Sequence, residues 1–303
     1  MNAIGIDIGG TKIEAQIFDA DWGRMSQRRI DTPRDYPSLV AAMADQIAWA
    51  SGQAGRPLPI GISAAGLVNP ATGLAYTANL AAMGHPFPAD IAAAAGRPVT
   101  YVNDCRALTL SEAIFGAARG MSPAVGLILG TGIGGGVAVD GRLVEGPSTL
   151  GGEFGHFALA AGPVVAHDLP ILICGGGRPG CPETLLPGPG LERLARHLTG
   201  RTLTAPQITA EWRIEPDLGP VRAVWCALVA EMLKTIAFVI DPACIVIGGG
   251  VSKAAGLTED LSAALRAIQL PGFAIPDIRI AQGGDASGAR GAAYAAWLAQ
   301  RHG

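Results

Sequence analysis

The pattern of hydrophobic and polar positions divides the chain into segments typical of strands and segments typical of helices. The N-terminal sequence IGIDIGGTKIEAQIFDADWG holds two short apolar segments around a glycine turn, followed by a turn that contains Asp. The sequence VGLILGTGIGGGVAVDGRLV, which begins at Val125, has the same order. Short apolar or alternating segments between turn signals predict β-strands. The repeat predicts two related halves that each open on a β-hairpin, unless two glycine-rich hairpins are similar by chance.

Helical spacing appears between the two hairpins and again after the second. One predicted helix has a single apolar face made by Leu39, Met43, Ile47 and Ala50. A longer one has apolar residues at three- and four-residue spacing, namely Val221, Val224, Trp225, Leu228, Met232 and Ile236. The segment TEDLSAALRAI predicts a third helix, with Thr258 as its N-cap and two acidic residues in its first turn. Strands that alternate with helices predict an α/β architecture.

A chain of 303 residues is long enough for two α/β units. We predict a smaller N-terminal unit at residues 1–116 and a larger C-terminal unit at residues 117–303, with the boundary near Phe115–Pro123. A helix at about 288–303 is a candidate to pack on the N-terminal unit. Three stretches rich in proline and glycine are predicted loops or excursions, at Pro57–Pro59, Pro163–Pro182 and Pro206–Pro220.

Composition and charge narrow the class of protein. Hydrophobic residues make up 49% of the chain and charged residues 16%, which predicts a sizeable core rather than disorder. The net charge of -3 offers no basic surface for a nucleic acid. We expect no membrane span, because long apolar runs contain breakers, and no signal peptide, because the N-terminus lacks a basic region. Five unevenly spaced cysteines do not make a disulfide framework, so we expect a reducing cytoplasm.

Two glycine-rich turns are candidates for phosphate binding. The segment GTGIGGG matches the G-x-G-x-x-G pattern, but a strand rather than a helix follows it, which argues against a dinucleotide-binding fold. Consecutive backbone N–H groups in a tight turn can still bind anions, and glycine permits close approach. A third glycine run follows the apolar segment ACIVI, where the alternative is a plain strand-to-helix turn. The candidate nucleotide-binding residues are Asp7, Gly9, Gly10, Thr11, Lys12, Gly130, Thr131, Gly132, Gly134, Gly248, Gly249 and Gly250.

Asp7 and Lys12 flank the first of these turns. A carboxylate beside a phosphate is repulsive unless a cation lies between them, so Asp7 indicates Mg²⁺, held through water. Lys12 either supplies positive charge to the phosphates or faces solvent.

The segment RPVTYVNDCRALTLSEA predicts a strand over Val99–Asn103 and a helix that begins near Asp104. Ligands of open α/β sheets bind at the carboxyl ends of the strands, and Asp104 lies at such an end. A carboxylate there can accept the proton that a hydroxyl loses as it attacks a phosphate. The position fits a helix N-cap as well, and the residues alone leave both interpretations open.

Five motifs, DIGGTK, NDCRA, LGTGIGGG, GEFGH and GCPE, resemble those of ROK-family sugar kinases in order and spacing, over essentially the whole chain. The phrases TPRDY and LSEA are similar to the bacterial N-acetylglucosamine kinases of that family. The resemblance implies a two-lobe actin/hexokinase-like (ribonuclease H-like) ATPase fold and phosphorylation of N-acetylglucosamine at its 6-hydroxyl by ATP with Mg²⁺. It further implies a homodimer. The DNA-binding domain of the family's repressors is not expected, because three residues precede the first predicted strand.

The resemblance also assigns roles to single residues. It implies Asp104 as the catalytic base, and as sugar contacts Gly66, Asn79, Asn103, Asp104, Glu153, His156 and Glu183. No charged residue lies between Ala64 and Met83, so an acidic substrate finds no obvious clamp there. The family motif continues as NDAN where this chain has Cys105 and Arg106. Arg106 therefore inherits no role, and it can neutralise phosphate or pair with an acid.

The segment LICGGGRPGCPE corresponds to the family's zinc loop, C-x-C-G-x-x-G-C, within a predicted excursion at 156–183. The resemblance implies three zinc ligands, His156, Cys174 and Cys181, and Gly176 stands where the family has a further cysteine. Structural zinc sites normally have four protein ligands. Three ligands can hold zinc with water or with a donor such as His167 or Asp168; alternatively, the metal is lost and the glycines preserve only the turns.

Two other functions remain open at this point. The same chemistry can act on glucose, N-acetylmannosamine or fructose. A non-catalytic sugar sensor can retain the fold, although Asp104 and both glycine turns are intact in this chain.

Overall fold

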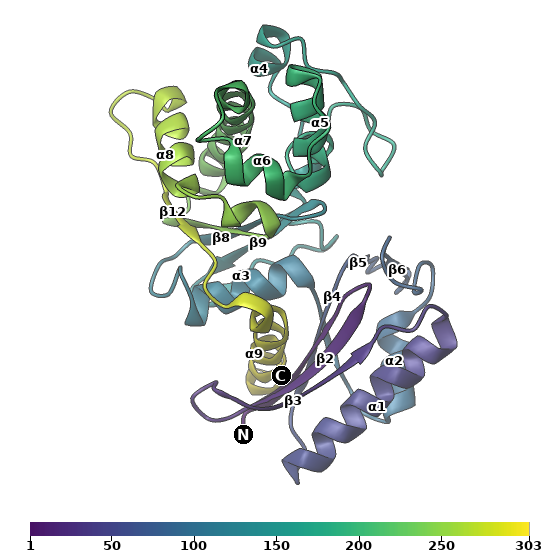
Figure 1. Ribbon diagram of the computed structural model, residues 1–303. Coiled ribbons are helices and arrows are strands. Elements are labelled where there is room, and N and C mark those ends of the chain that lie inside the picture. Colours follow the sequence, from purple (N-terminus) through teal and green to yellow (C-terminus); the bar gives the residue numbers. More distant parts are fainter. Residues whose placement is uncertain (303) are drawn as a thin grey trace. The chain divides into compact units, whose positions relative to one another are not determined.

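The computed structural model describes residues 1–302, and for Asp285 and His302 it describes the backbone alone. The chain forms two compact units (Figure 1). The first unit contains Met1–Arg119, Gly136–Gly151 and the residues from Gln282 onward, and the second contains Gly120–Gly135 and Gly152–Ala281. The chain therefore passes between the units four times, and neither unit is a single continuous segment.

The first unit is built on a five-stranded sheet. Its strand order is β3 (Arg24–Asp31), β2 (Lys12–Phe18), β1 (Ala3–Ile8), β4 (Ile60–Ala64) and β7 (Thr100–Asn103). The first three strands are antiparallel neighbours, and β1, β4 and β7 run parallel to one another. The helices of this unit are α1 (Tyr36–Ala54), α2 (Phe87–Ala95), α3 (Asp104–Phe115) and α9 (Ser287–His302). A short hairpin of β5 (Leu67–Val68) and β6 (Ala75–Tyr76) follows β4.

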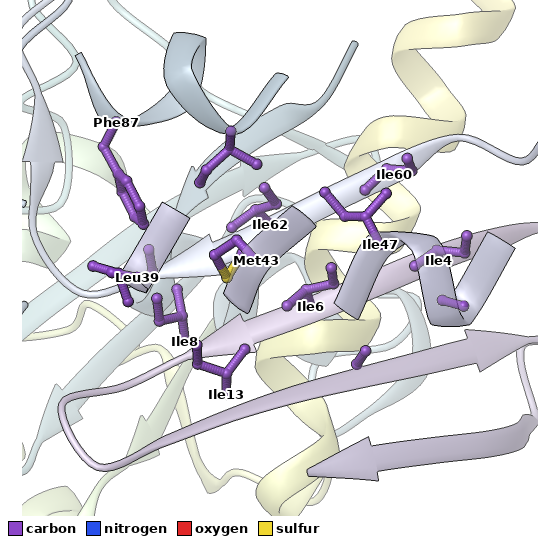
Figure 2. Close-up of a cluster of buried hydrophobic side chains, with 14 of the residues drawn as sticks. Ile4, Ile6, Ile8, Ile13, Leu39, Met43, Ile47, Ile60, Ile62 and Phe87 are labelled. Carbon is purple, nitrogen blue, oxygen red and sulfur yellow. The ribbon is translucent and has the colours of Figure 1, made fainter. Parts of the chain in front are cut away.

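The two faces of this sheet are packed in different ways. On one face, isoleucines at alternate positions of β1 pack against the predicted apolar face of α1, as Figure 2 shows for Ile4, Ile6, Ile8, Leu39, Met43 and Ile47. On the other face, glycines let α9 approach the strands closely. A Cβ atom at Gly5 would lie 2.0 Å from the Ala289 carbonyl oxygen, and one at Gly61 would lie 1.9 Å from that of Ala292. The sheet thus requires glycine at these two positions, one in β1 and one in β4.

Glu112 connects α3 to the segment that precedes α9. Its buried carboxylate accepts hydrogen bonds from the backbone N–H groups of Ala117 (2.9 Å), Gln282 (3.0 Å) and Gly283 (2.7 Å), and from the Ser287 hydroxyl (3.1 Å). Four donors satisfy a carboxylate that would be costly to bury alone.

A second five-stranded sheet repeats the topology of the first. Its order is β10 (Arg142–Leu143), β9 (Ile133–Val139), β8 (Ala124–Leu129), β11 (Cys244–Gly248) and β12 (Asp277–Ile280). In this second sheet β8 occupies the central position that β1 has in the first. It has an antiparallel hairpin on one side and parallel strands on the other. The two predicted hairpins and the α/β architecture are therefore confirmed. The remaining helices are α4 (Ala161–Ala166), α5 (Gly188–Thr199), α6 (Ala205–Glu211), α7 (Gly219–Ile240) and α8 (Leu257–Ile268), with 3-10 turns η1 (Phe154–His156), η2 (Pro182–Thr184), η3 (Pro216–Leu218), η4 (Gly250–Lys253) and η5 (Gly284–Ala286).

The long apolar helix α7 is a core helix of the second unit. Together with η3 it is long and apolar enough to cross a bilayer by composition alone, because an 18-residue stretch within Pro216–Ile240 has a mean hydropathy of 1.9. However, 56% of this stretch is buried inside the protein, and α7 packs against α5 and α8. Trp225 in its middle is fully buried and donates from Nε1 to the Leu186 carbonyl oxygen at 2.9 Å.

Two local predictions from the sequence are wrong. The N-cap of α8 is Gly256, in a left-handed conformation (φ 65°), and Thr258 lies within the first helical turn, where its hydroxyl bonds to Glu259. The stretch 206–220 is not a loop, because it contains most of α6, η3 and the start of α7. Its proline-rich composition concealed this, since proline is well tolerated in the first turn of a helix.

Candidate active site

Two carboxylates of the first unit lie at the carboxyl edge of its parallel strands. Asp7 of β1 pairs in register with Ser63 of β4, and Ala64 pairs with Asn103 at the end of β7. The Ser63 hydroxyl donates to Asp7 Oδ1 at 2.6 Å. Helix α3 begins at Asp104, directly after β7. The predicted strand-to-helix junction is therefore confirmed, and it brings Asp104 to the same edge of the sheet as Asp7.

Asn103, rather than Asp104, caps helix α3. Its side-chain oxygen accepts from the backbone N–H groups of Cys105 (3.0 Å) and Arg106 (3.2 Å). Asp104 Oδ1 accepts from Asn103 Nδ2 at 3.0 Å and from the Cys105 N–H at 2.9 Å. Burial raises the pKa of Asp104, and the hydrogen bonds from Cys105 and Asn103 act in the opposite direction. A partly buried carboxyl with a raised pKa is suited to accept a proton, and the neighbouring residue already performs the capping role.

Asp7 is perturbed in the same direction. Burial raises its pKa from 3.8 to about 6, although the Ser63 hydrogen bond lowers it. The charge of Asp104 raises the pKa further, and that of Lys12 lowers it. Two carboxylates close enough to act on each other favour a cation or a shared proton between them.

The segment after β4 brings Gly66 and Asn79 to the same region of the first unit. Asn103 Nδ2 donates to the Gly66 carbonyl oxygen at 2.9 Å. Gly66 has a left-handed backbone (φ 97°), and a Cβ there would lie 2.4 Å from the Tyr76 carbonyl oxygen. Asn79 lies against the first glycine turn, because a Cβ at Gly10 would be 3.0 Å from the Asn79 carbonyl oxygen. A cavity of about 70 Å³ is lined here by residues that include Gly66, Asn103 and Arg106.

Arg106 binds backbone carbonyl groups of the loop that follows β10. Its guanidinium is buried and donates from Nε to the Gly151 carbonyl oxygen at 3.1 Å and from Nη2 to that of Thr149. The Thr149 hydroxyl in turn donates to the Val68 carbonyl oxygen at 3.2 Å. Arg106 thus positions the 149–151 loop, and a planar guanidinium with several donors suits two carbonyl groups at once.

In the second unit, the predicted sugar contacts lie on two neighbouring 3-10 turns. Glu153 immediately precedes η1, which contains His156, and Glu183 lies in η2. The Glu183 carboxylate lies beside the second glycine turn, where the Ile133 N–H is 3.5 Å from its Oε2. A Cβ at Gly132 would be 3.1 Å from this oxygen, and one at Gly155 would be 3.4 Å from it. Glycine at both positions therefore leaves room for the carboxylate.

His156, Cys174 and Cys181 form a cluster in the second unit. Their ligand atoms lie within 4.8 Å of one another, and Cys174 Sγ is 3.9 Å from His156 Nδ1. A backbone hydrogen bond from Arg178 lowers the pKa of Cys174 to about 7, whereas burial raises the pKa of Cys181. Neither His167 nor Asp168 belongs to this cluster within residues 1–302, and a fourth ligand from either of them stays a prediction. Both side chains are exposed instead.

Gly176 lies where a fourth ligand would be needed. A Cβ at this position would be 3.7 Å from Cys174 Sγ and 4.0 Å from His156 Cε1. A cysteine side chain there would point into the cluster. The histidine nitrogen and the two thiols are the donor types that zinc prefers, so the residues fit this metal with one position open.

A cavity of about 540 Å³ in the second unit adjoins two of the predicted glycine turns. It is lined by Gly130, Gly188, Ala205, Pro206, Thr209, Ala210, Gly250, Val251, Lys253 and Ala255. Gly249 has a left-handed backbone (φ 87°), and a Cβ there would lie 2.4 Å from the Leu129 carbonyl oxygen. This glycine lets the turn after β11 pack against the turn after β8. Thr131 and Gly132 complete the latter turn, whereas Gly134 lies within β9 and Gly248 ends β11.

The other predicted nucleotide-binding residues belong to the first unit. Gly9, Gly10 and Thr11 form the tight turn between β1 and β2, in which the Gly9 N–H donates to the Lys12 carbonyl oxygen at 2.9 Å. The contribution of α6 to the cavity was not predicted from the sequence. The signal was present in TAPQ, because Thr204 at the N-cap, proline in the first turn and Gln207 three residues after the cap make a capping box.

Comparison with known proteins supports one family over nearly the whole chain. The sequence profile of the ROK family matches residues 3–301. An N-acetylgalactosamine kinase of Shewanella sp. (strain ANA-3) is 38% identical over 292 residues, which cover 95% of this chain and 94% of that protein. An N-acetyl-D-glucosamine kinase of Yersinia enterocolitica is 38% identical over 299 residues, which cover 96% of this chain and 97% of that protein.

Solved structures agree with this result. The crystal structure of a ROK hexokinase from Thermus thermophilus superposes with a TM-score of 0.89 at 32% identity and covers 100% of both chains. A ROK glucokinase from Streptomyces griseus, solved with glucose and AMPPNP, gives a TM-score of 0.77 at 27% identity and covers 96% of this chain and 98% of that one. The predicted hexokinase-like fold is confirmed.

Proposed function

Since the chain belongs to the ROK family and is an ATP-dependent sugar kinase, we propose that it phosphorylates N-acetyl-D-glucosamine at the 6-hydroxyl. The observation that supports a catalytic role most directly is Asp104, a partly buried carboxyl of raised pKa at the carboxyl edge of parallel strands. The choice of substrate is supported by the N-acetyl-D-glucosamine kinase named above, which matches this chain from end to end.

Asp104 is the general base of the proposed reaction. The 6-hydroxyl oxygen forms a bond to the γ-phosphorus of ATP, its proton passes to the Asp104 carboxylate, and ADP leaves with the bond between the γ-phosphorus and the bridging oxygen broken. Asn103 holds one Asp104 oxygen at 3.0 Å and binds the Gly66 carbonyl oxygen through the same amide nitrogen. This amide therefore orients the base relative to the segment that carries Gly66 and Asn79, which we propose contacts the sugar.

Binding of the nucleotide is assigned to the glycine turns and the large cavity of the second unit. We propose that Gly130, Thr131, Gly132 and Gly134 and the run Gly248, Gly249 and Gly250 surround the phosphates and ribose, with backbone N–H groups as donors. The terminal phosphate is bound by the turn of Gly9, Gly10 and Thr11 and by the positive charge of Lys12. Asp7 would hold Mg²⁺ through water, and the cation neutralises charge on the transferred group.

Glu153, His156 and Glu183 are proposed to bind sugar hydroxyls. A carboxylate can accept hydrogen bonds from two neighbouring hydroxyl groups of a sugar. Zinc held by His156, Cys174 and Cys181 would fix the orientation of the His156 ring and of the loop that leads to Glu183. These residues surround an open fourth position at Gly176.

The zinc proposal is tested by metal affinity. Apo protein is titrated with zinc in competition with a chromophoric chelator, for the wild type, Gly176→Cys and Cys181→Ser. Gly176→Cys should bind zinc at least about tenfold more tightly, because it completes a four-ligand site, and Cys181→Ser should lose zinc. If the wild type is fully active and retains no zinc in a purified, unchelated preparation, the proposal is wrong.

The reaction is tested with a panel of sugars and ATP in a coupled assay that detects ADP. The panel contains N-acetylglucosamine, N-acetylgalactosamine, N-acetylmannosamine, glucose and fructose, of which N-acetylgalactosamine is included because of the 38% identical Shewanella kinase. N-acetylglucosamine should give the highest kcat/KM. Asp104→Asn should keep its circular dichroism spectrum and lose about 10²–10⁴ in kcat. Sugar binding without turnover on any sugar would instead indicate a sensor.

We also propose a homodimer in a reducing cytoplasm. The proposed compartment rests on the five unevenly spaced cysteines, which do not make a disulfide framework. Light scattering coupled to size exclusion at micromolar concentration distinguishes a dimer from the 30.8 kDa monomer.

A further inference from the structure

The wall that α6 contributes to the large cavity has almost no hydrogen-bond donor left free. Its lining residues are Ala205, Pro206, Thr209 and Ala210. The Ala205 N–H donates to Glu192 Oε1 at 2.9 Å, and proline has no N–H to offer. The N–H groups of Thr209 and Ala210 lie four residues further along the helix and are satisfied within it.

The side chains of the lining are equally poor in available donors. The Thr209 hydroxyl points back to its own helix and donates to the carbonyl oxygens of Ala205 (3.0 Å) and Pro206 (3.2 Å). Beyond Thr209, Lys253 is the one lining residue with a polar side chain, and it is exposed at the rim. An exposed ammonium remains hydrated and gains little from a single contact.

The backbone N–H groups of the glycine positions around the cavity are partly engaged as well. Gly188 donates to the Gly130 carbonyl oxygen at 2.8 Å, and Gly130 donates to that of Gly132 at 3.1 Å. Ser252 donates to Gly249 at 3.3 Å. In the turn after β11, the Ala254 N–H likewise donates to the Val251 carbonyl oxygen at 3.1 Å.

Such a lining distinguishes bases by shape rather than by hydrogen bonds. Adenine, hypoxanthine and guanine have the same two-ring outline and differ in the groups at C6 and C2. A site that hydrogen-bonds a substrate group rejects an analogue without it by about 10⁴–10⁵, whereas an apolar pocket does not strongly reject an analogue that merely adds a polar group. We infer that this kinase holds the nucleobase by packing alone and accepts ITP and GTP as phosphoryl donors besides ATP. This inference rests on the proposed function, which places the nucleoside in this cavity.

The test compares kcat/KM for ATP, ITP and GTP at a saturating concentration of the best sugar of the panel. We expect the three values to agree within about tenfold, with the differences in KM rather than in kcat. A preference for ATP of more than about 100-fold would overturn the inference and leave the proposed kinase reaction intact. Absence of turnover with all three donors would overturn the proposed function and the inference with it.

Variants test whether this cavity is the base site. Ala210→Phe places a large side chain at an exposed lining position, so it should raise the KM of all three donors at least about tenfold without changing the KM of the sugar. Ala263→Phe, at an exposed position of α8 outside the lining, is the matched control and should change neither. Unchanged donor KM values in Ala210→Phe would overturn the inference.

Two further measurements separate the sources of any base preference. Lys253→Met should change the KM of ATP, ITP and GTP by the same factor, because the ammonium does not contact the base. Displacement of a fluorescent ATP analogue by ADP, IDP and GDP gives binding constants without turnover, and these should agree within about tenfold. If Lys253→Met raised the KM of GTP and ITP but not that of ATP, the ammonium would recognise the C6 oxygen of the base. This result would overturn the inference.

Discussion

Replacement of Asp7 by asparagine should stabilise the protein, and more so as the pH rises. Burial raises the pKa of Asp7 from 3.8 to about 6 in the folded protein. Between these values the folded state binds more protons than the unfolded state, so the stability of the wild type falls as the pH rises through this range. The stability that the raised pKa provides is fully present below pH 3.8 and is lost above about pH 6.

The size of the stabilisation expected for Asp7→Asn follows from the pKa shift of Asp7. A change of about 2.2 pKa units corresponds to about 3 kcal/mol at pH 8 and to about half of that at pH 5. Because Asp7 is partly buried rather than fully enclosed, these values are upper bounds. In a unit of this size they correspond to an increase in Tm of at most about 6–12 °C at pH 8. Asparagine retains an oxygen for the Ser63 hydroxyl, so the hydrogen bond at 2.6 Å is kept.

Thermal unfolding followed by circular dichroism, in buffer without Mg²⁺, measures this effect at pH 5, 6, 7 and 8. Asp21→Asn, which replaces an exposed carboxylate of the first unit, is the matched control and should leave Tm nearly constant. The reasoning would be refuted if Asp7→Asn changed Tm equally at every pH, or lowered it at pH 8. The same variant should need more Mg²⁺ for half-maximal activity, since the carboxylate proposed to hold the cation is gone.

Three further predictions concern the packing of the first unit. Gly61→Ala should lower Tm by more than about 10 °C, because its Cβ would overlap a carbonyl oxygen of α9. Gly52→Ala is the control, at an open exposed position within α1, and it should raise Tm by about 2 °C. Glu112→Ala should reduce the free energy of unfolding by about 3–5 kcal/mol, measured in urea, and Glu112→Gln by less, because glutamine retains an acceptor for some of the four donors. Arg106→Lys should speed hydrogen exchange in the loop that its guanidinium binds, since one ammonium cannot hold both carbonyl groups in the same geometry. Unchanged exchange in that loop would contradict the assigned role of Arg106.

Much of the fold was predictable because its signals are local. The apolar faces of α1 and α7 follow from three- and four-residue spacing, and both helices bury the predicted residues. The two hairpins were visible as glycine turns between short apolar segments, and the junction at Asp104 as a strand followed by a helix. These features depend on residues within one or two elements.

The parts that were missed depend on contacts between distant segments or on backbone geometry. Whether Asn103 or Asp104 caps α3 is decided by side-chain orientation, which residue type does not specify. Arg106 binds carbonyl groups more than 40 positions away, so no local pattern indicates its partners. The wrong N-cap of α8 has a similar cause, since a left-handed glycine at 256 displaces the cap from Thr258. The open position at Gly176, in contrast, was visible in the sequence by register with the family motif, and the structure adds where its Cβ would point.

The packing of α9 on β1 and β4 has a consequence for the biosynthesis of this protein. The glycine-lined face of the first sheet is completed by Ala289 and Ala292, which are translated almost 300 residues after β1. The second unit uses no residue beyond Ala281, so its last residue is translated before α9 begins. Domains commonly fold in the order in which they are made. Here the unit that is begun first is the unit that is completed last, and its uncovered sheet face must be kept from aggregating until the final helix emerges.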